Sequence, residues 1–210
     1  MPTIRFQAVF APLFALAVAA IGCSDDSAAG DAGVANITPP AECAINTPPA
    51  GWSYPAGPYG GDVDDTFADF TVKDCDGNEF RFGDVLAQAE LVLLNIGAGW
   101  CEPCVAETMT LDREVFREFC PRGLRVVQVL FEDEDSEIPT SLFCKQWRDS
   151  FSLSFPVLVD QLFVTETYFT SVLSQTPINF LIDPSGKIVF KSTGEPPADL
   201  GQRIDQLLPR

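Results

Sequence analysis

The chain has 210 residues, of which 46% are hydrophobic and 20% are charged, and this balance is typical of a globular protein rather than a disordered one. Lys and Arg number 13 against 30 Asp and Glu, so the formal net charge of −17 argues against nucleic acid and anionic lipid surfaces as partners. The sequence has no histidine, which excludes Ser-His and Cys-His nucleophile pairs and imidazole ligands for a metal.

The N-terminal segment resembles a bacterial lipoprotein signal. Arg5 is the one charged side chain before Asp25, and the apolar stretch over residues 8–22 is too short to span a membrane comfortably. Small residues end this stretch directly before Cys23, and a polar run follows. We therefore expect a signal peptide over residues 1–22, export, and a lipid on Cys23 that anchors the protein to a membrane of the cell envelope, facing the periplasm or the extracellular side. An ordinary secretory signal is the alternative, and it also exports the chain.

Residues 23–61 differ from the rest of the chain in composition. They are rich in Ala, Gly, Pro, Asp and Ser, which predicts an acidic tether with little regular structure. Trp52, Tyr54 and Tyr59 are candidates to hold the later part of this tether on the domain. The domain itself is predicted over residues 62–210.

From Thr66 onward the hydrophobic pattern predicts strands that alternate with helices. Strands are expected over residues 67–72, 79–82, 90–97, 124–131, 155–159, 177–182 and 187–191. Helices are expected over residues 103–120, 138–150, 161–172 and 198–208, with Leu142, Phe143 and Trp147 of the second helix facing inward. The first two strands form a hairpin around Asp76-Gly77. This order predicts an α/β fold in which helices flank a mixed central sheet with an N-terminal β-hairpin.

Cys101 and Cys104 lie where the buried strand over 90–97 gives way to a helix. The free N–H groups and partial positive charge of a helix N-terminus favour a thiolate and lower the pKa of a cysteine placed there. A thiolate is the attacking species in disulfide exchange, and Cys104 is one turn further on, near enough to close a disulfide. Pro103 is tolerated in the first helical turn. The spacing therefore predicts a redox-active dithiol.

The cysteine pair has two alternative interpretations, a zinc site and a structural disulfide. A zinc site without histidine would need two more cysteines at matching spacing, and the other cysteines occur singly, so we expect neither a metal nor a cofactor. The other alternative is a purely structural disulfide, but a disulfide that closes such a small loop constrains little of the unfolded chain.

Four further cysteines belong to the part of the chain expected to be exported. They are Cys43, Cys75, Cys120 and Cys144. An even number in an oxidising compartment indicates two structural disulfides, for which three connectivities exist. We expect Cys120 and Cys144 to lie on helices at opposite faces of the sheet, which disfavours that pair.

Two segments resemble the thioredoxin superfamily, most of all its extracytoplasmic TlpA/ResA-like branch. The first is Leu93–Cys104, which contains Trp-Cys-Glu-Pro-Cys, and the second is Thr176–Asp183 with the Gly186-Lys187-Ile188 that follows. The similarity extends over roughly residues 62–208, with the elements in the expected order. It implies a thioredoxin-like fold and a thiol–disulfide oxidoreductase.

The resemblance also implies roles for individual residues. Cys101 would be the exposed nucleophile and Cys104 the buried resolving thiol. Pro177 would be a cis-proline that faces the dithiol, and Thr176 would offer backbone hydrogen bonds to an extended substrate. Trp100 would either flank the dithiol as a recognition surface or simply pack.

Three other positions near the dithiol carry expectations from the same resemblance. Glu107 matches an acidic residue that tunes the cysteines in ResA-like proteins, and its alternative is a solvated glutamate on the helix surface. Asn95 replaces the buried aspartate of thioredoxin, as is usual in this branch. Ile96-Gly97 replaces a common aromatic pair, from which we expect a more open floor of the site.

The expected function is that of a membrane-tethered thiol–disulfide oxidoreductase. The resemblance implies protein thiols and disulfides as substrates, apo-cytochrome c being one in the family, and an upstream electron donor in the membrane. Glu102 beside Cys101 opposes thiolate formation, which favours reduction over oxidation of substrates. One alternative is a thiol peroxidase, although no Pro-x-x-x-Thr-x-x-Cys motif is present, and another is a non-catalytic metal-binding or interaction module.

Overall fold

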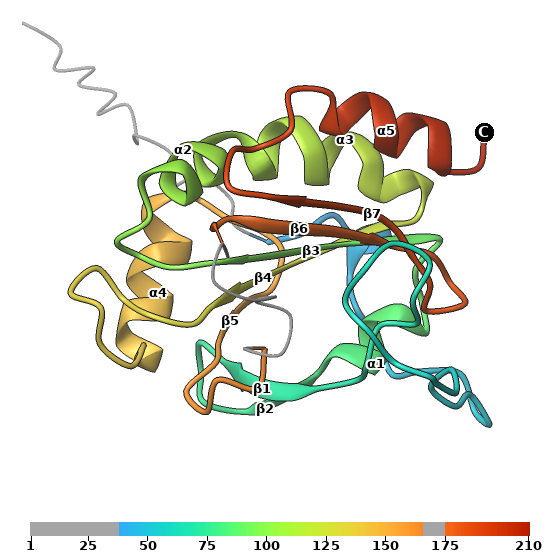
Figure 1. Ribbon diagram of the computed structural model, residues 1–210, viewed down its shortest axis with the longest axis horizontal. Helices are drawn as coiled ribbons and strands as arrows, with labels where there is room; N and C mark the ends of the chain where they lie inside the picture. Colours follow the sequence, from blue (N-terminus) through green and yellow to red (C-terminus); the bar gives the residue numbers. More distant parts are fainter. Residues whose placement is uncertain (1–37, 166–174) are drawn as a thin grey trace, which may run out of the picture. The chain divides into compact units, whose positions relative to one another are not determined.

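The computed structural model describes residues 38–165 and 175–210, which belong to a compact unit spanning Ala35–Arg210. Among these residues, seven strands form one mixed sheet in the order β2-β1-β5-β4-β3-β6-β7 (Figure 1). The strands are β1 Thr71–Asp74, β2 Glu79–Arg81, β3 Leu91–Gly97, β4 Leu124–Leu130, β5 Val157–Val159, β6 Ile178–Ile182 and β7 Ile188–Thr193. The predicted α/β fold with a mixed sheet and an N-terminal hairpin of β1 and β2 is confirmed.

The centre of the sheet is buried on both faces. β3 pairs in parallel with β4 and antiparallel with β6, and every residue of these three strands is buried. Burial on both faces accounts for their nearly continuous apolar runs. Each strand nevertheless carries a buried amide side chain, and in the register Asn95 lies opposite both Gln128 and Asn179.

Helices cover both faces of the sheet. They are η1 Ala41–Cys43, α1 Phe82–Leu86, α2 Glu102–Thr110, the π-helical turn η2 Leu111–Phe116, α3 Arg117–Phe119, η3 Cys120–Arg122, α4 Ser141–Ser150 and α5 Leu200–Leu207. One core cluster joins η2, α4 and α5 through Phe116, Trp147 and Ile204, and a second contains Val85 of α1. In Figure 1, α2, α3 and α5 lie on one side of the sheet and α1 on the other.

The pairing of the four additional cysteines corrects one expectation. Disulfides join Cys43 to Cys120 and Cys75 to Cys144, so the Cys120–Cys144 pair is absent, as expected. The reason given for that absence was wrong, because η2 and α4 contribute to the same core cluster and lie on the same face. β3, β4 and β5 are parallel neighbours that follow one another in the same direction across the sheet. Because both connections between them are right-handed crossovers, the helices in these connections lie on the same face.

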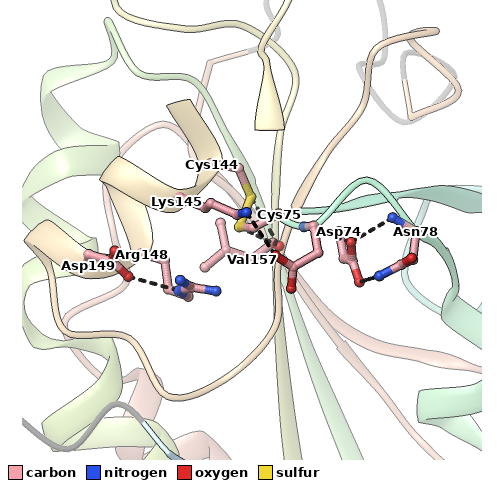
Figure 2. A network of polar contacts seen from close by, with 9 residues as sticks. Asp74, Cys75, Asn78, Cys144, Lys145, Arg148, Asp149 and Val157 are labelled. Carbon is pink, nitrogen blue, oxygen red and sulfur yellow. Dashed lines mark hydrogen bonds and ion pairs between the residues drawn. A yellow bond between two sulfur atoms is a disulfide. The ribbon is translucent and has the colours of Figure 1, made fainter. Parts of the chain in front are cut away.

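The Cys75–Cys144 disulfide ties the hairpin to α4 beside β5 (Figure 2). Both sulfur atoms lie 3.4 Å from the backbone oxygen of Val157 (Figure 2). Lys145, the residue after Cys144, forms an ion pair with Asp76 at 2.9 Å. The disulfide is buried, since Cys75 is 4% and Cys144 0% exposed. It therefore fixes the outer part of the sheet rather than presenting a second exposed dithiol.

Several predicted elements begin or end elsewhere. Residues 67–70 precede β1 instead of belonging to it, because Phe67 and Phe70 pack their rings against Phe82. Phe143 and Trp147 face inward as predicted, whereas Leu142 is 65% exposed. Residues 161–165 form turns, and the remainder of the helix predicted over 161–172 lies outside the described residues.

The described part of the predicted tether contacts the domain. The hydroxyl of Tyr54 donates to the backbone oxygen of Phe67 at 3.0 Å, and Arg125 Nη2 donates to the backbone oxygen of Glu42 at 3.0 Å. The Cys43–Cys120 disulfide adds a covalent link between this segment and η3. Cys23 and the predicted signal peptide lie outside the described residues, and within those residues no helix has the length and apolarity to cross a membrane.

Candidate active site

Cys101 and Cys104 form a disulfide at the junction of β3 and α2. The S–S distance is 2.08 Å, and Cys101 is the N-cap of α2, where its Sγ atom accepts a hydrogen bond from the Cys104 N–H at 3.2 Å. The helix thus directs one of its free N–H groups at the first sulfur, an arrangement that favours negative charge there. The two cysteines thus lie between a buried strand and a helix, the local structure that the sequence predicts for them.

Gly97 forms the floor beneath this disulfide. A Cβ atom at this position would lie 2.9 Å from Cys104 Sγ, so any side chain there would displace the sulfur. Ile96 is fully buried beside it. The floor is therefore closely packed, and the expectation of a more open floor was wrong.

A groove of about 400 Å³ borders Cys101. Its lining residues are Trp100, Cys101, Glu102, Pro103, Gln175, Thr176, Gly194 and Glu195. The Thr176–Pro177 peptide bond is cis, and the Thr176 hydroxyl donates to Cys101 Sγ at 3.2 Å. Both cysteines are buried in the disulfide, Cys101 at 3% and Cys104 at 1% exposure, so the expectation of an exposed Cys101 is wrong in this oxidised form. The two cysteines still differ, because Cys101 lines the groove and Cys104 does not.

Trp100 is 47% exposed at the rim of the groove. Its Nε1 atom donates to Glu132 Oε2 at 2.6 Å, and its ring meets Phe131 edge-on with centroids 6.3 Å apart. These contacts hold one face of the ring while leaving much of it accessible. The position suits both interpretations offered from the sequence, packing and recognition.

Negative charge surrounds the groove. Among its lining residues, Glu102 and Glu195 carry carboxylates and none is a lysine or an arginine. Across the part of the chain that the structure describes, the ion pairs of Lys and Arg use other carboxylates. The carboxylates around the dithiol are thus not neutralised by neighbouring cations.

Glu107 lies one turn after Cys104 in α2 but is not on the protein surface. It is only 6% exposed, and its carboxylate accepts hydrogen bonds from Asn95 Nδ2 at 2.7 Å and Asn179 Nδ2 at 2.9 Å. Burial raises the pKa of Glu107 to about 7, while the hydrogen bonds from Asn179 and Asn95 act in the opposite direction. The interpretation as a solvated surface glutamate was wrong.

Sequence reasoning identified Asn95 near the dithiol but missed the rest of this polar network. Asn179, Gln128, Thr108 and Trp147 complete it through side-chain hydrogen bonds of 2.7–2.9 Å. One signal was available, since β3, β4 and β6 each contain a single amide within an otherwise mostly apolar run. Such residues in adjacent buried strands require partners, and here they partner one another.

The four other cysteines in the described part of the chain have no part in this site. The disulfides Cys43–Cys120 and Cys75–Cys144 are separate from the dithiol, and Cys23 lies outside the described residues. Across residues 38–165 and 175–210, no cluster of three or more His, Cys, Asp or Glu side chains could hold a metal ion.

Comparison with known proteins gives a consistent result. A family model described as the AhpC/TSA family matches residues 63–191. Thiol-disulfide oxidoreductase ResA of Bacillus cereus is 31% identical over 126 residues, which make up 60% of this chain and 66% of that protein. The chain therefore spans slightly less than two thirds of the length of this curated relative.

Solved structures share the fold. The thioredoxin domain of a thiol-disulfide oxidoreductase from Bacteroides vulgatus has a TM-score of 0.56 at 20% identity, covering 71% of this chain and 98% of that one. Peroxidoxin BcpB from Mycobacterium tuberculosis has a TM-score of 0.55 at 19% identity, covering 69% and 95%. These likenesses confirm the predicted thioredoxin-like fold.

Proposed function

The chain belongs to the AhpC/TSA family, and on that premise we propose that it is a thiol–disulfide oxidoreductase whose redox centre is Cys101 and Cys104. The observation that carries this proposal is the position of the disulfide at the N-terminus of α2, with Cys101 in a groove where its Sγ accepts a hydrogen bond from Thr176, the residue before cis-Pro177. The ResA name of its relatives supports the same activity.

The reduced dithiol would transfer two electrons in two exchange steps. The Cys101 thiolate attacks one sulfur of the substrate disulfide, so that a bond forms between them and the substrate S–S bond breaks, and the departing sulfur takes up a proton. Cys104 then loses its proton and attacks Cys101 Sγ, which breaks the mixed disulfide and releases the second substrate sulfur. The protein is left with the Cys101–Cys104 disulfide, and the substrate is left as two thiols.

Glu107 would accept the proton that Cys104 loses. It lies one turn after Cys104 on the same helix, and a carboxyl group with a pKa of about 7 exchanges protons readily near neutral pH. Its burial keeps it away from the substrate groove, so it would act on the resolving step rather than on recognition. Trp100 and Thr176 line the groove and would contact the substrate, and Pro177 would act through its cis bond to Thr176.

The direction of electron flow is proposed to be reduction of substrates. The carboxylates of Glu102 and Glu195 line the groove and form no ion pair with the described lysine and arginine side chains, so they oppose a stable thiolate on Cys101, and a less stable thiolate makes a stronger reductant. A midpoint potential near that of thioredoxin, about −270 mV, would support this direction. A value near about −120 mV, typical of a strong oxidant, would contradict it.

We also propose that the protein works outside the cytoplasm, anchored by a lipid on Cys23. The support is the signal-like segment before Cys23 and the two additional disulfides, which are typical of an oxidising compartment. Cells that express the full chain with a radiolabelled fatty acid should yield labelled protein, and Cys23→Ser should not be labelled. An unlabelled wild-type protein would rule out the anchor.

Electron transfer to insulin tests the central proposal. Reduced protein mixed with insulin should lose two thiols per chain while insulin disulfides are cleaved, and Cys101→Ser should be inactive. A peroxidase is the second candidate, because the same fold occurs in a peroxidoxin. Consumption of hydrogen peroxide in the absence of any insulin reduction would favour the peroxidase and reject the proposed function.

A further inference from the structure

We propose that Trp147 and Gln128 are positioning residues, which hold the amide groups around Glu107 in one orientation and so favour its carboxylate form. Trp147 lies in α4 and Gln128 in β4, and neither contacts the groove or the dithiol sulfurs. The orientation of the amide groups is inferred from hydrogen-bond geometry alone. The effect of this orientation on thiol exchange rests on the proposed function.

The orientation of these amide groups is set first by Trp147, whose side chain can donate a hydrogen bond but cannot accept one. Trp147 Nε1 donates to Gln128 Oε1 at 2.8 Å, and both residues are buried. An indole N–H has no acceptor form, so Gln128 must present its oxygen to Trp147 and its NH₂ group to the opposite side. Trp147 thereby fixes which way round the Gln128 amide lies.

Thr108 imposes the same orientation independently. Its hydroxyl donates to the backbone oxygen of Cys104 at 2.7 Å, so its oxygen is left as an acceptor. Gln128 Nε2 fills that role at 2.8 Å. A reversed Gln128 would place its oxygen against the Thr108 oxygen and its NH₂ against the indole N–H, losing both bonds.

The orientation passes from Gln128 to two asparagines. Gln128 Nε2 donates to Asn95 Oδ1 at 2.9 Å, so Asn95 turns its NH₂ group toward Glu107 Oε2 at 2.7 Å and Asn179 Oδ1 at 2.9 Å. Asn179, whose oxygen is occupied, turns its own NH₂ toward Glu107 Oε1 at 2.9 Å. Each carboxylate oxygen of Glu107 therefore faces an amide donor.

This arrangement distinguishes the two protonation states of Glu107. A carboxylate accepts only and fits the two donors, whereas a protonated carboxyl needs an acceptor for its O–H. An amide could supply one by turning round, but Asn95 cannot reverse unless Gln128 does, and Trp147 and Thr108 oppose that reversal. Burial favours the neutral form of Glu107, whereas this hydrogen-bond network favours its carboxylate form.

Few other titratable groups face Glu107. On its own helix Cys104 lies one turn before it, and Glu114 of η2 lines the same cavity of about 350 Å³. The cavity's other described lining residues do not titrate. Those residues are Ala106, Thr110, Leu111, Val115, Pro196, Pro197, Ala198, Leu200 and Gly201. β3, β4, β6 and α4 supply the network only with neutral groups, the three amides and Trp147.

The test follows the titration of Glu107 in the oxidised protein, where the disulfide removes thiol titration. Carbon-13 NMR of the glutamate side-chain carboxyl gives the midpoint, and the signal that Glu107→Gln removes is assigned to Glu107. Trp147→Phe should raise this midpoint by about one pH unit, as expected when hydrogen bonding to a charged group is weakened. Gln128→Leu should raise it in the same way, and it provides a second measurement if Trp147→Phe folds poorly. Trp52→Phe, outside the network, is the matched control and should leave the midpoint unchanged.

Unchanged midpoints in folded Trp147→Phe and Gln128→Leu would overturn the inference. A similar rise in Trp52→Phe would also overturn it, since the effect would then be one of general loosening. The pH profile of thiol exchange is a separate readout for the proposed role of Glu107. If the NMR midpoint moves while the exchange profile does not, the orientation is upheld and the proposed role of Glu107 fails.

Discussion

The hydroxyl of Thr176 donates to Cys101 Sγ at 3.2 Å across a sequence separation of 75 residues. The same sulfur accepts from the Cys104 N–H at 3.2 Å, so hydrogen-bond donors reach it from both α2 and the loop before β6. Cys101 is the cysteine that lines the groove. The two cysteines are thus distinguished by hydrogen bonding as well as by access.

This difference predicts distinct outcomes for the two single cysteine variants. Cys101→Ser should abolish exchange with insulin, because no accessible nucleophile remains. Cys104→Ser should accumulate mixed disulfides, since attack still occurs while resolution does not. Non-reducing electrophoresis with mass spectrometry of the trapped species measures both. Equal trapping by the two variants would mean that access does not separate their roles.

Loss of the Thr176 hydroxyl should slow the reaction of Cys101. In reduced Thr176→Val, one donor to the thiolate is absent, and alkylation of Cys101 at neutral pH should slow by about tenfold. The rate is measured by iodoacetamide labelling and peptide mass spectrometry. Thr193→Val, at the exposed end of β7, is the control. If Cys101 were alkylated as slowly in Thr193→Val as in Thr176→Val, the slower rate could not be attributed to the Thr176 hydroxyl.

Glu107 should make stability depend on pH. Its folded pKa of about 7 exceeds the unfolded value of 4.5, so the folded protein binds more protons between these values. The corresponding stability is fully present below about pH 4.5 and is lost as the pH rises through about 7, amounting to about 3 kcal/mol. Urea unfolding of the oxidised protein at several pH values should show this decline, and Glu107→Gln should lack it. A parallel decline in both proteins would assign the effect to other groups.

The carboxylates at the groove should favour cationic substrates. Reduced protein should react faster with cystamine, which carries two ammonium groups, than with dithiodipropionate, which carries two carboxylates, by about tenfold at low salt. Glu102→Gln combined with Glu195→Gln should narrow the ratio, whereas Glu118→Gln, an exposed change in α3, should not. Stopped-flow fluorescence measures the rates. A ratio of one at low salt would be incompatible with this prediction.

The Cys43–Cys120 disulfide should contribute more stability than the dithiol. It closes a sequence separation of 77 residues, against 3 for Cys101–Cys104, and stabilisation by chain entropy grows with loop length. Replacing Cys43 and Cys120 by Ala should lower the free energy of unfolding by about 2–4 kcal/mol. The matched control replaces Cys101 and Cys104 by Ala. Equal losses in urea unfolding would contradict the prediction.

The sequence predicted those features that local patterns determine. The apolar runs of β3 and β4 and the junction at Cys101 were visible in the chain itself. The burial of Glu107 was not, because it depends on Asn179 of β6, which pairs with β3 only in the folded sheet. The face of the sheet that α4 occupies likewise depends on the order of the strands in the sheet, and the alternation of strands and helices along the chain does not reveal that order.

The two additional disulfides interleave along the chain. Cys75 lies between Cys43 and Cys120, while Cys120 lies between Cys75 and Cys144. A polypeptide oxidised in order as it emerges from a translocation channel would therefore join Cys43 to Cys75, a pair absent from the native protein. If the chain is exported as proposed, native pairing requires either that oxidation wait for later cysteines or that early bonds be exchanged, and exchange takes seconds to hours depending on oxidant and isomerase. In the second case, a protein proposed to rearrange the disulfides of others would itself need that chemistry during its biogenesis.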